Sequence, residues 1–400
     1  MSHPFKLTVE LKQHTPIIHF QHDQEGATLR ATEVKAKLDR FLTNDFPIIA
    51  PKTAEVYSKE IESIRIAQKE KKPTGYKLKF FSNKENVKYY YFESFFSKNK
   101  HETFEVEQLL GKHFNKNISA VAPAAYFADR EKRTGDNVDA LSGIKLGVFY
   151  SDNIKCEIFS INSRLLQLLN ISLAPFFMIN NFGTRSSKGF GSFEVLNPIK
   201  DYTIAEVFKN FGQCAFTKKI PKSIEETLKI IDSTYKKLRS NVATNESEIR
   251  DFFEDNYNST WSKKLVTEKV AKGKKEWTPE EEDFDIQFIR ALLGLPELHD
   301  YPQLKPDKPK VKIKEKLDEI QRFPSPITFT IHGDKLILFA RENPNEILGR
   351  AFEFFVGKSA EDEQKKPNGR YALLKTPDQF EIKEFLKSSP TLKNSWNNVK

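Results

Sequence analysis

The sequence predicts an α+β protein whose first half is a ferredoxin-like β-α-β unit with an insertion. Alternating strand patterns and single-stripe helix patterns occur in the order strand, helix, inserted region, strands, helix, loop, strand. A leucine-rich helix pattern leads through a glycine-rich loop into a short strand. The 400 residues, 38% of them hydrophobic, are enough for two domains with cores of their own.

The elements of the first 92 residues follow from apolar periodicity. Residues 6–13 alternate between apolar and polar side chains, and Pro16 ends this half-buried strand. Residues 32–43 place their apolar side chains on one face, which predicts an amphipathic helix with a basic side. Residues 76–81 and 87–92 flank a short polar turn and predict a β-hairpin.

Further strands are expected at 118–127, 144–150 and 154–160, a helix at 162–180 and a last strand of this domain at 192–196. Pro175 is expected to kink the helix, because proline removes a hydrogen bond from the helix interior. The glycine-rich loop lies between this helix and the last strand.

The second half is expected to be more helical. Ser223-x-x-Glu226 is a capping-box sequence that opens a helix with one apolar stripe, and Thr278-Pro279 opens another that closes near Gly294. Residues 301–316 are rich in proline and lysine and predict an extended basic connector. Strands are expected at 326–331 and 335–340, on either side of His332-Gly333-Asp334, and a last helix at 376–387.

These patterns predict two domains. The first covers residues 1–200, with an insertion at about 44–115 and the glycine-rich loop at 183–191. The second, more helical domain covers residues 201–400 and includes the basic connector.

Residues 182–193 read Phe-Gly-Thr-Arg-Ser-Ser-Lys-Gly-Phe-Gly-Ser-Phe, the stretch that says most about function. Glycines permit positive φ, and successive amides in such a loop can form an anion-binding nest. Cationic side chains and serine hydroxyls add charge and hydrogen-bond donors, so the segment suits a phosphate backbone. Its spacing matches neither a mononucleotide P-loop nor a dinucleotide fingerprint.

Composition limits the remaining classes. The chain carries 64 basic and 55 acidic residues, a net charge of +9, which permits nucleic-acid binding without proving it. Cys156 and Cys214 give no disulfide framework and no paired metal motif, so we expect a reducing cytoplasm. We expect no metal and no cofactor. We find no signal-peptide pattern and no run long enough for a membrane span, so we expect a soluble protein.

Four segments resemble the RAMP superfamily of CRISPR-associated proteins. The glycine loop looks like that of the subunit that caps the crRNA 3′ side in type III-B (Cmr) effector complexes. Residues in agreement lie at Thr15-Pro16, at the Leu29–Lys35 entry into the first helix, and at 322–329. The sequence departs from the family at 17–20, where a glycine pair is usual, and in a first helix without tryptophan.

The resemblance implies tandem ferredoxin-like domains, similar to RNA-recognition motifs, with helical insertions. It implies a non-catalytic subunit of an antiviral ribonucleoprotein complex that contacts crRNA, target RNA and other RAMP subunits, with no membrane partner. The residues that it places against RNA are Arg30, Lys35, Gly183, Arg185, Ser186, Ser187, Lys188, Gly189, Phe190 and Gly191. Such contacts would position RNA without reading its sequence.

Two alternatives stay open. His14, His19 and His22 cluster near the first helix, where RAMP-type crRNA-processing endoribonucleases commonly use a histidine for acid–base chemistry. The aromatic residues at 80–81 and 89–92 could stack on RNA bases, but core packing together with a subunit interface is the favoured interpretation.

Overall fold

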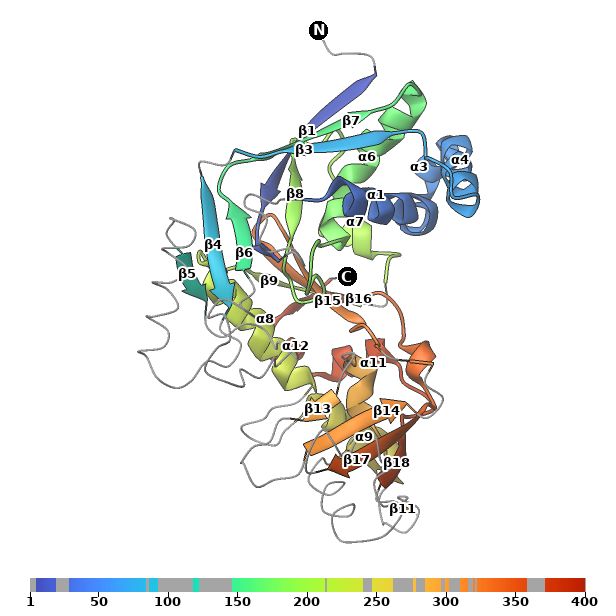
Figure 1. Cartoon of the computed structure of the whole chain (residues 1–400), viewed down its shortest axis with the longest axis vertical. Coiled ribbons are helices and arrows are strands. Elements are labelled where there is room, and N and C mark those ends of the chain that lie inside the picture. Colours follow the sequence, from blue (N-terminus) through green and yellow to red (C-terminus); the bar gives the residue numbers. More distant parts are fainter. Residues whose placement is uncertain are drawn as a thin grey trace. The chain divides into compact units, whose positions relative to one another are not determined.

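The structure is a computed structural model of the chain (Figure 1). It describes residues 5–18, 29–83, 86–92, 118–121, 146–212, 214–239, 247–261, 276–277, 285–295, 299–301, 310–315, 319–320, 322–357 and 371–399. The chain divides into two compact units. Unit 1 contains Met1–Asp232, Thr328–Phe339 and Asn397–Lys400, and unit 2 contains Ser233–Ile327 and Ala340–Trp396.

The first β-α-β unit is present as predicted. Its elements are β1 (Lys6–Gln13), α1 (Ala31–Arg40), β3 (Lys77–Phe81), β7 (Ile154–Phe159), α6 (Ser163–Ile179) and β8 (Phe193–Leu196). The strands form an antiparallel sheet in the order β3-β7-β1-β8, so the first and third strands of the unit occupy the centre. This is the strand order of a ferredoxin-like domain.

The core of unit 1 lies on one face of this sheet. Alternation along β7 buries Ile154, Cys156 and Ile158, as a half-buried strand requires. Val34 and Leu38, four residues apart, lie on the buried face of α1. α6 contributes most of its length to the same core, and Pro175 lies inside this one helix.

Between α1 and β3 the chain forms a helical insertion. It consists of a π-helical turn η1 (Phe41–Asp45), α2 (Phe46–Ile49), α3 (Pro51–Val56) and α4 (Ser58–Lys69). Pro47 and Pro51 occupy the first turns of α2 and α3, where their missing N–H groups cost no helical hydrogen bond.

The predicted hairpin of residues 76–92 is wrong. β3 pairs with β7, whereas β4 (Val87–Phe92) pairs with β6 (Leu146–Tyr150) and β5 (Ile118–Val121). Together with β2 (Ile17–Ile18), these form a second sheet in the order β2-β6-β4-β5. The two strand patterns are correct, but each strand takes its partner from a distant part of the chain.

A second ferredoxin-like order follows in the sequence. Its elements are β9 (Cys214–Lys219), α8 (Ile224–Arg239), β15 (Ile327–His332), β16 (Lys335–Ala340), the helices α11 (Ile382–Ser388) and α12 (Pro390–Ser395), and β19 (Asn397–Asn398). The sheet order β15-β16-β9-β19 again places second, third, first and fourth strands side by side. The prediction of tandem ferredoxin-like domains is confirmed.

Unit 2 contains a sheet of its own. Its order is β11 (Glu276–Trp277), β18 (Tyr371–Lys375), β17 (Ala351–Gly357), β14 (Lys310–Glu315) and β13 (His299–Tyr301). Residues 310–315 of the predicted basic connector are therefore a strand, and 302–309 lie outside the described residues. The remaining elements of unit 2 are α9 (Glu248–Tyr257), the strand pair β10 (Ser259–Thr260) and β12 (Asp285–Ile286), and two 3-10 turns, η3 (Ile289–Leu293) and η4 (Asn345–Ile347).

The helix expected at 278–294 is wrong in its described part, because residues 285–286 form β12 and 289–293 form η3. A short helix that the sequence patterns missed, α7 (Ile204–Phe208), begins with a complete Thr203–Glu206 capping box. Within the described ranges, no helix combines the length and hydrophobicity needed to cross a bilayer.

Candidate nucleic-acid interface

The glycine-rich loop between α6 and β8 adopts backbone conformations that require glycine. Gly183, Gly189 and Gly191 have φ of +78°, +79° and +64°. A Cβ atom on Gly191 would lie 2.0 Å from the Phe182 carbonyl oxygen, and one on Gly183 would lie 2.6 Å from the Ile18 carbonyl oxygen. The glycines therefore allow the loop to fold back on itself and against β2.

Thr15 and Pro16, directly after β1, hold one side of the loop. The Thr15 hydroxyl donates to the Gly189 carbonyl at 2.6 Å and accepts from the Ser192 N–H at 3.0 Å. The Gly191 N–H donates to the Pro16 carbonyl at 2.9 Å. The Thr-Pro segment is thus a structural partner of the loop.

Asn181 and β15 hold the other side. The Asn181 amide donates to the carbonyls of Ser186 and Phe329, each at 2.6 Å, and accepts from the Thr330 hydroxyl at 3.0 Å. The Phe329 N–H donates to the Ser187 carbonyl at 3.0 Å. Sequence reasoning missed Asn181, because its partners in β15 are about 150 positions away.

Helix α1 reaches the loop through Glu33 and Lys37. The Gly183 N–H donates to a Glu33 carboxylate oxygen at 3.0 Å, and the Lys37 ammonium lies 3.0 Å from the same oxygen. Lys37 also donates to the Asn181 carbonyl at 2.7 Å, and its ammonium lies 4.9 Å from the centre of the Phe182 ring. The first amide of the loop therefore already holds an anionic oxygen.

Lys35 makes different contacts. Its ammonium lies 3.4 Å from the centre of the Tyr76 ring and 3.8 Å from the Asp39 carboxylate, and it donates to the Thr74 hydroxyl. Burial lowers the pKa of Lys35, and the charge and hydrogen bond of Asp39 oppose that shift. The contact between Lys35 and RNA stays a prediction, whereas Lys37 is the α1 lysine beside the loop.

The predicted loop residues differ in their exposure. Gly189, Phe190 and Gly191 are buried, while residues 183–188 are half-buried. The Ser186 and Ser187 hydroxyls form no hydrogen bond with the described part of the chain. The Lys188 side-chain nitrogen is buried, and Arg30 is half-buried at the N-cap of α1. Thr184 donates both its N–H and its hydroxyl to the Ile18 carbonyl, so the accessible hydroxyl donors of the loop are those of Ser186 and Ser187.

His14, the described member of the predicted histidine cluster, lies in a His–Glu–His arrangement. Its Nε2 atom is 2.8 Å from Glu194 Oε2, which also accepts from the Gly333 N–H at 3.1 Å, while His332 Nδ1 lies 3.4 Å from Glu194 Oε1. The His14 side chain is only 4% exposed. His19 and His22 lie outside the described residues.

This environment shifts the pKa of Glu194 and that of His332. Burial opposes ionisation of Glu194, but the His14 hydrogen bond, the His332 and His14 charges and the Gly333 N–H together lower its pKa. Burial also lowers the pKa of His332, against the attraction of Glu194 and Asp201. Among the described residues, no three His, Cys, Asp or Glu side chains form a metal-binding group.

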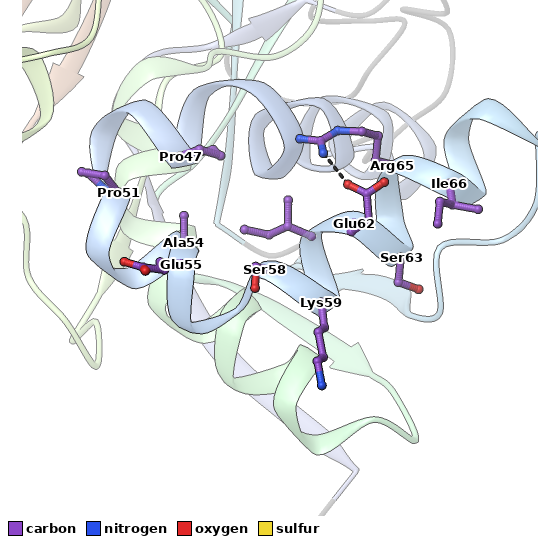
Figure 2. Close-up of a pocket in the computed structure, with 11 residues that line it drawn as sticks. Pro47, Pro51, Ala54, Glu55, Ser58, Lys59, Glu62, Ser63, Arg65 and Ile66 are labelled. Atoms are coloured by element: carbon purple, nitrogen blue, oxygen red, sulfur yellow. Dashed lines mark hydrogen bonds and ion pairs between the residues drawn. The ribbon is translucent and has the colours of Figure 1, made fainter.

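An open groove of about 860 Å³ lies on the helical insertion (Figure 2). The residues that line it come from a different part of the sequence than the residues predicted to contact RNA. Pro47, Pro51, Ala54 and Ile61 contribute apolar surface, and the ion-paired Glu62 and Arg65 also line the groove. None of the ten residues predicted to contact RNA lines this groove.

Comparisons with known proteins cover the whole described fold. The family model of the Cmr1 N-terminal domain matches residues 4–242, and that of the Cmr1 C-terminal domain matches residues 244–398. The crystal structure of Cmr1 from Pyrococcus furiosus (apo form) is similar at 12% identity, over 99% of this chain and 98% of that chain, with a TM-score of 0.35. No curated protein matches the chain.

The match to the N-terminal domain model includes the glycine loop, the Thr-Pro segment and the entry into α1. Matched by both models along nearly its full length, the chain belongs to the Cmr1 family, the RAMP subunits of type III-B CRISPR effector complexes.

Proposed function

We propose that this subunit of a type III-B effector complex binds RNA through its glycine loop and carries out no chemistry of its own. Its ligand is the 3′ side of the crRNA, the target RNA, or both. The loop would contact phosphates and riboses, which position an RNA strand without reading its sequence.

One observation carries the proposal. The Gly183 N–H donates to the Glu33 carboxylate at 3.0 Å, so the loop already binds an oxyanion. A phosphate oxygen presents the same acceptor chemistry. Beside it, half-buried Arg185 supplies a cation, and the Ser186 and Ser187 hydroxyls supply donors. The Glu33 carboxylate also repels phosphate, so it limits the affinity of this site.

The test is RNA affinity across a salt series. Arg185→Ala removes one cation and keeps the Cβ atom, so the loop backbone, with φ of +58° at this residue, is left as it is. Losing one phosphate contact flattens the slope of log K against log salt by about 0.7 for a single strand. Glu33→Gln keeps the acceptor for the Gly183 N–H and removes the charge, so affinity should rise a few-fold.

The matched control is Lys72→Ala, which removes a cation that is 69% exposed beyond the end of α4. It should leave both affinity and slope unchanged. Equal effects of Arg185→Ala and Lys72→Ala would mean that only the general surface charge attracts RNA, and the loop would lose its role.

The same incubations also test the absence of chemistry. His14 is nearly inaccessible and bound to Glu194, which favours a structural role for it. Repeat RNA should therefore remain intact. Cleavage that His19→Ala or His22→Ala abolishes would instead identify the chain as an endoribonuclease.

A further inference from the structure

The open face of the first four-stranded sheet carries exposed aromatic rings. Side chains on one face of β1, β3 and β7 pack in the core, so the alternate side chains reach solvent. Phe81 on β3 and Phe159 on β7 lie on the solvent side, with 39% and 45% of their surface exposed. By contrast, Phe80, the neighbour of Phe81, packs against the core.

Phe159 lies between two lysines. The strand register places it opposite Lys6 on β1 and opposite Lys77 on β3. Side chains directly opposite each other in an antiparallel sheet have Cβ atoms about 4.5–5.5 Å apart. Both lysines are exposed, so the ring has a cation on each side of its strand.

Phe81 has the same kind of surroundings. It lies opposite Lys155, whose ammonium is 5.9 Å from the ring centre. The Lys79 ammonium, two residues earlier on the same strand, is 4.6 Å from the ring centre. The combination of one exposed ring and two lysines therefore occurs twice on this face.

The charge of the face is positive. Its members are five lysines and three glutamates: Lys6, Lys12, Lys77, Lys79, Lys155, Glu10, Glu157 and Glu194. Glu157 is bound by Lys6 and Lys155, each at 2.8 Å, and these hydrogen bonds lower its pKa. Lys12 and Lys77 form no ion pair with any described residue, so the excess of cations remains available to a polyanion.

We propose that this face binds single-stranded RNA, with one base stacked on Phe81 and another on Phe159, and with the flanking lysines against the phosphates. Alternating aromatic and cationic side chains are the chemistry of single-strand binding, because every base presents a π-face and every nucleotide a phosphate. The rings are separated by four positions along the strands, about 13 Å, so they take separate bases. This surface is distinct from the glycine loop. The proposal rests on the proposed function only in taking RNA as the ligand.

The test is fluorescence anisotropy of the full chain with a labelled oligouridine of about 15 nucleotides and with a duplex RNA of equal length. Phe81→Leu and Phe159→Leu keep an apolar side chain and remove the ring. Each should weaken single-strand binding about tenfold, and Phe159→Tyr should restore it. Duplex binding should be unaffected, because duplex bases are already stacked. Ile66→Ala, which trims a side chain that is 49% exposed on α4, is the control and should change nothing.

Each outcome decides the proposal. Loss of single-strand affinity in both leucine variants, with rescue by tyrosine and an unchanged thermal midpoint, supports base stacking. Wild-type affinity in the leucine variants, together with a loss in Arg185→Ala, overturns the sheet proposal and leaves the loop proposal standing. Equal losses for single strand and duplex also overturn it, because they indicate a general electrostatic surface. No RNA binding by the wild-type chain overturns both proposals.

Discussion

Gly191→Ala should destabilise unit 1 strongly, because the new Cβ atom has no space. It would lie 2.0 Å from the Phe182 carbonyl oxygen and 2.9 Å from its carbonyl carbon. The Phe182 peptide must therefore move by about 1 Å before any normal contact distance is reached. That movement breaks the hydrogen bond from the Phe182 N–H to the Gly191 carbonyl, which measures 2.9 Å.

The magnitude has two parts. A φ of +64° costs an alanine about 1–2 kcal/mol relative to glycine. Losing the hydrogen bond and displacing the fully buried Phe182 add about 2 kcal/mol. The sum of about 3–4 kcal/mol corresponds to a fall of about 6–16 °C in the unfolding midpoint of a unit of this size.

Gly333→Ala provides the matched control. Gly333 has a φ of +57°, yet a Cβ atom there would meet nothing within 4 Å. It should therefore carry only the backbone cost, a fall of about 2–8 °C in the unfolding midpoint. Circular dichroism melting of the three proteins compares the two effects. Equal midpoints for the two variants would refute the reasoning, since close approach at Gly191 would then contribute nothing.

Two further predictions concern titrating groups. Cys156 is 1% exposed, and burial raises the pKa of its thiol to about 12. A thiol reagent should therefore modify only Cys214 in the native protein, and both cysteines after unfolding. Rapid modification of two cysteines in the native protein would contradict this prediction. The lowered pKa values of Glu194 and His332 give stability that is present above their unfolded values, about 4.3 and 6.5, and is lost as pH falls through the lower folded values. The thermal unfolding midpoint should therefore decrease as the pH drops below about 6.5. His332→Gln should flatten the part of the plot of midpoint against pH that lies above about pH 5. Identical plots for the variant and the wild type would contradict the role of this imidazole.

Local patterns predicted most of the elements of the first domain, because alternation and helical stripes report burial directly. β7 is an example, since Ile154, Cys156 and Ile158 alternate with polar residues and one aromatic residue. Strand partners could not be predicted in the same way. The polar turn after Phe81 looks like a hairpin turn, yet Phe81 pairs with Lys155, and no local pattern encodes that distance.

For the candidate site too, local features were predictable from the sequence and long-range partners were not. The glycine loop itself was evident in the sequence, because three glycines among cationic and hydroxyl side chains are typical of an anion-binding turn. The side chains that hold it were not, since Asn181 and Glu33 act through partners about 150 positions away. The sequence predicted a basic side for α1, but only the fold separates Lys35, which is bound to Asp39, from Lys37, which lies beside the loop.

The pairing of β9 with β19 affects how this protein is made. Asn397 lies opposite Thr217, a separation of 180 positions. At about 5–20 residues per second, a ribosome needs on the order of 10–35 s to supply that partner. During this time one edge of β9 has unsatisfied backbone donors and acceptors, which can recruit strands from other nascent chains. Yield in the cell should therefore depend on elongation rate and on chaperones that shield this edge until translation reaches the last strand.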